Sequence, residues 1–384
     1  MNLLDRYVFK SVLFTCVAAV GMFAFIVVVP NFARDLMPHV LAGQLPFSMV
    51  VKLVTLLVPH AITYALPMGM LTGVLLTLGR LSADSEITAM RAAGVGIPRA
   101  TLPVVWLALL GVALGLYFNF ESMPRARVEY HRALAAAVRA NPLSFIVPKT
   151  FIRDFPGYVV YVSEKDGSIL RDFWLWELDR ERRVSRVVRA ESGEFDYDDA
   201  TNEFILTLTQ AQVETRSEKT PEHFAEAQLV GAFGQWGPIR LSLERFFGRG
   251  NNVRMKREWL TYEQLQAERA RLAAEPVPAA REDAEKLARD RMKLEIIYHD
   301  KFNTALAVLS LALIAVPLGI KVSRRETSAN FGVAVGLTLA YYLMTASIKV
   351  LDRYPEVRPD LLLWLPNLLF IGAGAWLMAQ VERR

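Results

Sequence analysis

The chain has 384 residues, 53% of them hydrophobic, and a formal net charge of +5 at pH 7, which is too small to indicate a nucleic-acid-binding surface by itself. Its single cysteine excludes an intrachain disulfide, and the sequence has neither a Cys/His cluster with zinc spacing nor a P-loop for ATP. The apolar residues concentrate toward the two ends and leave a polar middle, which predicts two membrane blocks around a polar domain.

Three apolar stretches in the first 120 residues predict membrane spans. Residues 12–29 carry no charge, and no small-residue cleavage site follows them, so we expect an uncleaved span and not a signal peptide. The second and third stretches are 47–78 and 100–118. Within the second, Gly69 and Gly73 form a small-xxx-small pair, which permits close contact with another helix.

A short polar segment, 81–98, separates the second and third spans. Ser82 is the expected N-cap of a helix over 82–96, and glycines with a proline end it. By spacing alone this helix is either a plain connector or an amphipathic docking element whose apolar side needs a partner. The residues that follow Ser82 at helical spacing are Glu86, Ile87, Met90 and Arg91.

The middle of the chain predicts a β-rich domain with flanking helices. Short β-prone runs separated by turn signals indicate an antiparallel β-sandwich or an open barrel. Helices are expected over 121–140 and 259–290, and Thr261 with Gln264 forms a capping box at the start of the second. The β-prone runs are 158–162, 173–176, 184–188 and 204–209.

Three further apolar stretches, 302–320, 331–350 and 361–381, predict the second membrane block. Orientation follows from the basic residues in short loops, which are in excess on the cytoplasmic side. Both termini are therefore expected in the cytoplasm and the β domain outside, which means the periplasm in a bacterial envelope. One side carries Arg6, Lys10, Arg80, Arg91, Arg99, Lys321, Arg324, Arg325, Arg383 and Arg384, and the other Arg34, Lys349, Arg353, Arg358 and, at its edge, Lys52.

The sequence offers no catalytic constellation. Its five histidines are scattered, no G-x-S-x-G motif is present, and the carboxylates of the β domain are spread over turns. We therefore expect a chain that is not an enzyme and that holds no metal.

Four features resemble the permease family of the lipopolysaccharide-export system. They are the start Leu4-Asp5-Arg6-Tyr7, the stretch 75–94 (LLTLGRLSADSEITAMRAAG), the order of three spans, β domain and three spans, and Ala140-Asn141-Pro142 ahead of the strands. The resemblance covers essentially the whole chain, the β domain by layout more than by motif. It implies six transmembrane helices with an inserted periplasmic jellyroll-like antiparallel β domain, divided as 1–120, 121–300 and 301–384.

The resemblance also implies partners and site residues. Such a permease extracts lipopolysaccharide from the inner membrane, pairs with a paralogous or identical permease, and passes the lipid to periplasmic jellyroll bridge proteins. ATP and Mg²⁺ are bound by a separate cytoplasmic ABC ATPase dimer, so this chain itself needs no cofactor. The ATPase-coupling residues are Ser85, Glu86, Ile87, Met90 and Arg91, and the lipid-phosphate residues are Arg34 and Lys349.

Some alternatives stay open at this stage. Arg34 and Lys349 are otherwise interfacial cations that snorkel to the headgroups. Asn31 and Asp35 flank Arg34 where relatives tend to carry further basic residues, which leaves the headgroup charge open, and the motifs do not separate F-type from G-type subunits, with a slight lean to F. A mechanotransmitting subunit that signals without moving lipid usually has four spans, and a membrane-anchored periplasmic enzyme would need a catalytic cluster.

Overall fold

The structure is a computed structural model of the whole chain. It describes residues 3–41, 43, 45–140, 147–152, 157–179, 183–198, 203–216, 229–242, 256–276, 278, 281–321 and 327–383. The chain divides into two compact units: one comprises residues 1–32, 54–128 and 256–384, and the other residues 33–53 and 129–255. We call the first the helical unit and the second the sheet unit.

Six helices among the described residues are long and apolar enough to cross a membrane, as the sequence predicts. They are built from the elements α1 (Leu3–Asp35), α3 (Phe47–Ala83), α5 (Ile97–Tyr117), α9 (Arg281–Lys321), α10 (Thr327–Lys349) and α12 (Leu365–Arg383). The shorter helical elements are α2 (Met37–Leu41), α4 (Glu86–Ala92), η1 (Phe118–Ser122), α6 (Met123–Ala140), η3 (Arg257–Trp259), α8 (Tyr262–Ala274), η4 (Val350–Arg353), η5 (Pro355–Val357) and α11 (Pro359–Leu362).

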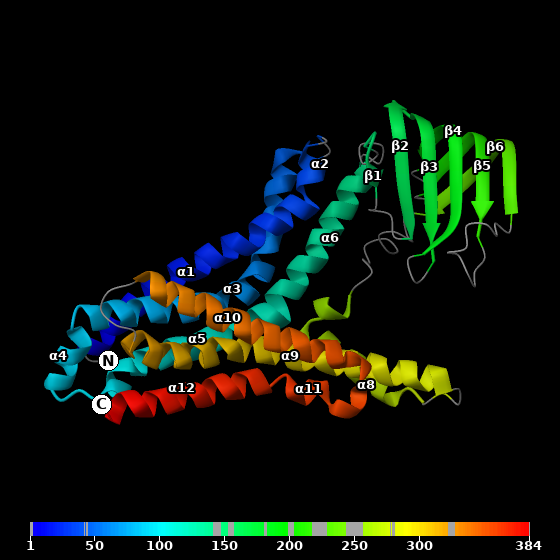
Figure 1. Cartoon of the computed structure of the whole chain (residues 1–384). Coiled ribbons are helices and arrows are strands. Elements are labelled where there is room, and N and C mark those ends of the chain that lie inside the picture. Colours follow the sequence, from blue (N-terminus) through cyan, green and yellow to red (C-terminus); the bar gives the residue numbers. More distant parts are fainter. Residues whose placement is uncertain are drawn as a thin grey trace. The chain divides into compact units, whose positions relative to one another are not determined.

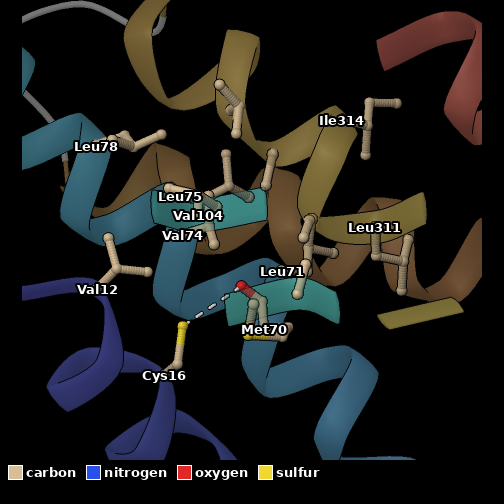
Figure 2. Close-up of a cluster of buried hydrophobic side chains, with 14 of the residues drawn as sticks. Val12, Cys16, Met70, Leu71, Val74, Leu75, Leu78, Val104, Leu311 and Ile314 are labelled. Atoms are coloured by element: carbon tan, nitrogen blue, oxygen red, sulfur yellow. Dashed lines mark hydrogen bonds between the residues drawn. The ribbon is translucent and has the colours of Figure 1, made fainter. Parts of the chain in front are cut away.

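The helical unit is organised around α9, which packs against α5 and α12 (Figure 1). Apolar side chains from α1, α3, α5 and α9 form one buried cluster, in which Leu71, Leu75 and Leu311 have at most 1% exposure. Figure 2 shows this cluster, with the Cys16 thiol of α1 directed at the Met70 carbonyl of α3 at 3.9 Å. The same cluster includes Ile87 of α4, Tyr341 of α10 and Phe370 of α12, so van der Waals packing of buried side chains connects all six spans.

Gly69 and Gly73 allow α1 and α3 to approach closely, which confirms the small-xxx-small interpretation. A Cβ atom added at Gly73 would lie 2.6 Å from the Cα atom of Cys16, and one at Gly69 would lie 2.6 Å from the backbone nitrogen of Val20. Real Cβ atoms do not approach backbone atoms so closely, so only glycine fits at these two positions without a shift of α1.

Buried polar side chains join the last three spans. The Asn367 amide of α12 donates to the backbone carbonyl of Asn303 in α9 at 2.9 Å, and the Asn303 amide donates to the Tyr341 hydroxyl of α10 at 3.2 Å. Ser310 of α9 donates to the Asn367 side-chain oxygen at 2.6 Å. Because few alternative partners exist inside a membrane bundle, these bonds fix the register of α9, α10 and α12.

α9 is much longer than the span that the sequence predicts within it. Its 41 residues extend over about 60 Å, roughly twice the apolar thickness of a bilayer. The charged first half pairs with α8 in a helical hairpin, where Arg269 forms a two-pronged contact with Glu295 at 2.7 and 2.8 Å. The predicted capping box is confirmed, since Gln264 accepts a bond from the Thr261 backbone N–H at 3.1 Å.

The end of span α5 is marked by a π-helical turn, η1, that leads directly into α6. Lys301 of α9 donates from its ammonium group to the Asn119 carbonyl at 2.7 Å, and the Asn119 amide donates back to the Lys301 carbonyl at 2.8 Å. A π-turn leaves backbone carbonyls without their usual helical partner, so this reciprocal pair stabilises it.

The sheet unit contains one antiparallel sheet whose six described strands neighbour one another in chain order (Figure 1). One face is buried by residues such as Val162, Phe173, Val188 and Leu208. On the other face Trp174 lies opposite Tyr161 and Arg189, and the Arg189 guanidinium is 4.6 Å from the Trp174 ring centre. The strands are β1 (Phe151–Ile152), β2 (Tyr158–Asp166), β3 (Ile169–Leu178), β4 (Val184–Asp198), β5 (Glu203–Thr215) and β6 (Leu229–Ser242).

The four predicted β-prone runs lie in β2, β3, β4 and β5, whereas β1 and β6 were not predicted. β6 contains Gly231, Gly234 and Gly237 followed by Pro238, residues that read as loop in a sequence pattern. Backbone pairing with β5 nevertheless places it in the sheet. Asn141 and Pro142, expected to end α6, lie outside the described residues.

Candidate functional site

The polar segment between α3 and α5 forms the helix α4, which begins later than predicted. Ser82 is not its N-cap: α3 continues to Ala83, and the Ser82 hydroxyl donates to the Ile320 carbonyl of α9 at 3.0 Å. Ser85 takes the N-cap position, with a left-handed backbone at φ 59°, and its side chain makes no capping bond. This left-handed residue turns the chain sharply between α3 and α4.

The apolar side of α4 faces the protein's own core. Ile87 is only 7% exposed and belongs to the buried cluster of the helical unit, and Met90 packs against the same cluster. The sequence-based hypothesis placed both in the groove of an ATPase, but the structure gives them partners within the chain. Ser85 and Arg91 are exposed, whereas Glu86 and Met90 are half-buried. The exposed surface of α4 also includes Thr88, Ala89 and Ala92.

Glu86 is held by the first helix. The Tyr7 hydroxyl of α1 donates to Glu86 Oε1 at 3.1 Å, which joins α4 directly to the first span. A second link lies nearby, where Arg99 of α5 meets Asp5 of α1 at 2.9 Å. In the sequence, Asp5 and Tyr7 stand out only because residues 4–7 resemble the N-terminus of the permease family. That resemblance was the available signal for both residues.

The ends of the helical unit are distinct in Figure 1. The start of α1 and the end of α12 lie at the same end of the unit as α4, and the end of α10 lies at the opposite end with α11. α4 and Lys349 therefore occupy opposite ends of the bundle. This arrangement agrees with the expected topology, in which both termini and α4 share one side of the membrane.

Arg34 lies at the end of α1, within the sheet unit. Its side chain is 74% exposed and forms a two-pronged contact with the adjacent Asp35, with 2.7 Å between Arg34 Nε and Asp35 Oδ1. A contact between neighbouring exposed residues is weak and easily exchanged. The guanidinium is thus accessible to an external anion.

Lys349 ends α10, within the helical unit, and is paired with a residue that the sequence analysis did not select. Its ammonium group lies 2.8 Å from Oδ1 of Asp300 in α9. Asp300 stands in a run of polar residues immediately before an apolar span, which was the available sequence signal. Arg34 belongs to the sheet unit and Lys349 to the helical unit.

Metal and catalytic chemistry find no support in the described part of the chain. No group of three or more His, Cys, Asp or Glu side chains among those residues is placed to hold a metal ion.

The family of the chain follows from comparison with known proteins. The family model "Lipopolysaccharide export system permease LptF/LptG" matches residues 6–380. This chain belongs to the LptF/LptG permease family. The match takes in both membrane blocks and the β insertion between them, and it confirms the resemblance found in the sequence.

Individual relatives agree with the family. The chain is 25% identical over 338 residues to the lipopolysaccharide export system permease protein LptF of Escherichia coli K12, covering 86% of this chain and 82% of the relative. It is also 25% identical over 204 residues to LptG of Haemophilus influenzae, covering 52% of this chain and 56% of that protein. The chain is therefore a multi-pass inner-membrane permease of the lipopolysaccharide export system.

Proposed function

We propose that this chain is the F-type permease subunit that lifts lipopolysaccharide out of the inner membrane for delivery to a periplasmic bridge. The observation that carries the proposal is the family match over residues 6–380 together with six spans and an inserted antiparallel sheet. The F-type relative covers 86% of the chain and the G-type relative 52%, which favours the F-type assignment.

The proposed assembly contains a second permease, paralogous or identical, and a cytoplasmic ABC ATPase dimer that binds ATP and Mg²⁺. The ATPase docks at α4 and contacts Ser85, Glu86 and Arg91, which are the polar residues of the predicted set and are exposed or half-buried. Ile87 and Met90 serve a different purpose in this proposal: they fasten α4 to the bundle, so that a push on α4 moves the spans behind it. Both termini and α4 face the cytoplasm, and the sheet unit faces the periplasm and the bridge proteins.

The lipid is recognised in this proposal by its anionic phosphates. Arg34 and Lys349 are cations at span ends on the proposed periplasmic side, where a guanidinium or ammonium forms charge-assisted bonds with phosphate oxygens. The Arg34 side chain is 74% exposed, and an anion can displace its contact with the adjacent Asp35. Lys349 is paired with Asp300, which an anion has to displace.

Depletion of the protein in living cells tests the proposed function. We expect newly made lipopolysaccharide to accumulate in the inner membrane and its amount at the cell surface to fall as the protein is lost. Surface labelling of lipopolysaccharide after depletion measures this, with a plasmid-borne copy of the gene as the control that restores export. Normal surface delivery after complete depletion would show that the chain does not transport the lipid.

A further inference from the structure

The Lys349 ammonium is already engaged by an internal carboxylate. It lies 2.8 Å from Asp300 Oδ1, and the two side chains retain 40% and 25% of their exposure, respectively. The pair joins the last turn of α10 to the middle of α9, where α9 enters its apolar half. An external anion therefore meets a cation whose charge is balanced, and it has to compete for that cation.

The geometry of the pair makes such competition feasible. Asp300 Oδ1 has almost no accessible surface, yet it receives no hydrogen bond of standard geometry in the described part of the chain, although the ammonium nitrogen is near. The contact is thus close in distance but poorly directed. A poorly directed pair gains Coulomb attraction without a full hydrogen bond, and it exchanges more readily than a two-pronged one.

A third helix, α3, carries an aromatic side chain that interacts electrostatically with the pair. The charges of Asp300 and Lys349 both act on Tyr64 of α3. Tyr342 of α10 donates to the Tyr64 carbonyl at 3.4 Å, and the two rings lie 6.3 Å apart. The two tyrosines thus join α3 to α10, the helix that carries Lys349.

We propose that Asp300 is a specificity-determining residue: it occupies Lys349 until a lipid with a strongly anionic headgroup displaces it. This inference rests on the proposed function, in which Lys349 binds lipid phosphate. A phosphomonoester carries between one and two negative charges and three acceptor oxygens, so it competes well with a single carboxylate. A zwitterionic phospholipid carries its own ammonium group and competes poorly.

Asp300 would thereby limit the binding of phospholipids, which are present in large excess over the transported lipid. Zwitterionic phospholipids surround any transporter in the bilayer, and an unpaired lysine at the end of a span would bind them as well as the cargo. An internal competitor subtracts the same free energy from every ligand, and weak ligands then fall below useful affinity while strong ones do not. A tie that only holds α9 to α10 would stabilise the fold without any effect on lipid choice.

The test measures the lipid bound to the detergent-solubilised permease complex after separate incubations with the same concentration of bis-phosphorylated lipid A or phosphatidylethanolamine, chosen so that lipid A nearly saturates the wild-type complex. Native mass spectrometry gives the ratio of the two lipids retained. Asp300→Asn removes the charge at nearly constant shape, and we expect more of both lipids, with the ratio of lipid A to phosphatidylethanolamine falling about threefold to tenfold. Asp300→Ser, a smaller neutral variant, carries the same expectation if the asparagine variant does not fold.

Two further variants separate the possible causes. Asp352→Asn makes the same change of charge in the loop that follows α10, where Asp352 lies 4.0 Å from Lys293, and it should leave the ratio unchanged. Lys349→Gln should lower lipid A retention, and adding Asp300→Asn to it should change nothing further, because no cation is left to compete for.

The outcomes distinguish this inference from the proposed function. An unchanged lipid ratio in Asp300→Asn, with reduced lipid A retention in Lys349→Gln, overturns the competition by Asp300 and leaves the lipid-binding lysine in place. Unchanged lipid A retention in Lys349→Gln overturns the lysine's part in the proposed function and the inference with it. A fall in the ratio that appears equally in Asp352→Asn assigns the effect to general surface charge and also overturns the inference.

Discussion

Glu86 has a partner inside the chain, and this partner changes what docking at α4 requires. The carboxylate accepts a bond from the Tyr7 hydroxyl at 3.1 Å, and the contact is exposed. An incoming ATPase that uses Glu86 has to share it with Tyr7 or replace Tyr7. Because Tyr7 is part of α1, a change at Glu86 also reaches span one directly.

Removing the Tyr7 hydroxyl tests this sharing. In Tyr7→Phe we expect the ATPase to bind about two- to fivefold more tightly, because an exposed bond of this kind is worth about 0.5–1 kcal/mol and no longer has to be broken. Titration of the purified ATPase against the detergent-solubilised permease measures the affinity. Tyr354→Phe, an exposed tyrosine at 62% exposure in the loop after α10, is the matched control and should bind as the wild type does. Weaker binding in Tyr7→Phe would mean that the hydroxyl orients Glu86 for the partner.

Residue pairs of this kind lie beyond sequence reasoning. Tyr7 and Glu86 are 79 positions apart, and nothing in either local pattern specifies the other. Ser82 was the natural N-cap by type and place, but its hydroxyl found an acceptor in α9, and α3 therefore continued past it. Ile87 and Met90 were correctly placed on the apolar side of a helix, whereas the identity of what covers that side depended on the packed bundle.

At the scale of elements, the contact between α1 and α3 depends on two glycines one turn apart. In Gly73→Ala we expect a loss of about 1–3 kcal/mol, because the new Cβ atom would lie 2.6 Å from the Cys16 Cα atom and α1 has to move. Thermal unfolding of the purified permease in detergent measures the change. Gly336→Ala in α10 is the control, since nothing lies within 4 Å of its added Cβ atom. It should be neutral or stabilise slightly, because alanine favours a helix.

Comparison of Gly73→Ala with Gly336→Ala shows which result would contradict a close contact between α1 and α3. A Gly73→Ala protein as stable as Gly336→Ala would mean that α1 and α3 lie farther apart than the structure places them. A uniform loss in both variants would instead indicate that any added volume in the spans is harmful.

Elements with strong local signals were predictable and elements without them were not. Each of the six spans was found because an uninterrupted apolar run of this length has few other structural uses. Strands β2 to β5 were found from their β-branched and aromatic runs, but β6 was missed because its glycines and proline favour loops in isolation. The continuity of α9 was missed because a change of composition near residue 300 resembles a domain boundary, although the helix passes through it.

At the scale of the whole molecule, the sequence predicts which parts of the chain lie in the membrane, but it does not predict the contacts within those parts. Apolar blocks at both ends and a polar middle predict two membrane blocks around a polar domain, and only the resemblance to the permease family implies that ATP is bound by a separate chain. The structure adds that α4 and Lys349 belong to one helical unit and that Arg34 belongs to the sheet unit. In the proposed function, ATPase docking and lipid binding use different residues, which separate variants can address.

We expect the two activities to fail independently. Glu86→Ala should reduce ATPase retained during purification about tenfold, because a charged contact is lost, while lipid A crosslinking to a photoreactive amino acid at position 31 stays at the wild-type level. Arg34→Glu should reduce that crosslinking at least about fivefold and leave ATPase retention unchanged, because it places a negative charge beside the lipid phosphate. Asp84→Ala and Arg383→Glu are the controls of like charge change. Loss of both activities in either single variant would mean that the variant disrupts the fold, and unchanged crosslinking in Arg34→Glu would return Arg34 to an interfacial cation that only anchors α1.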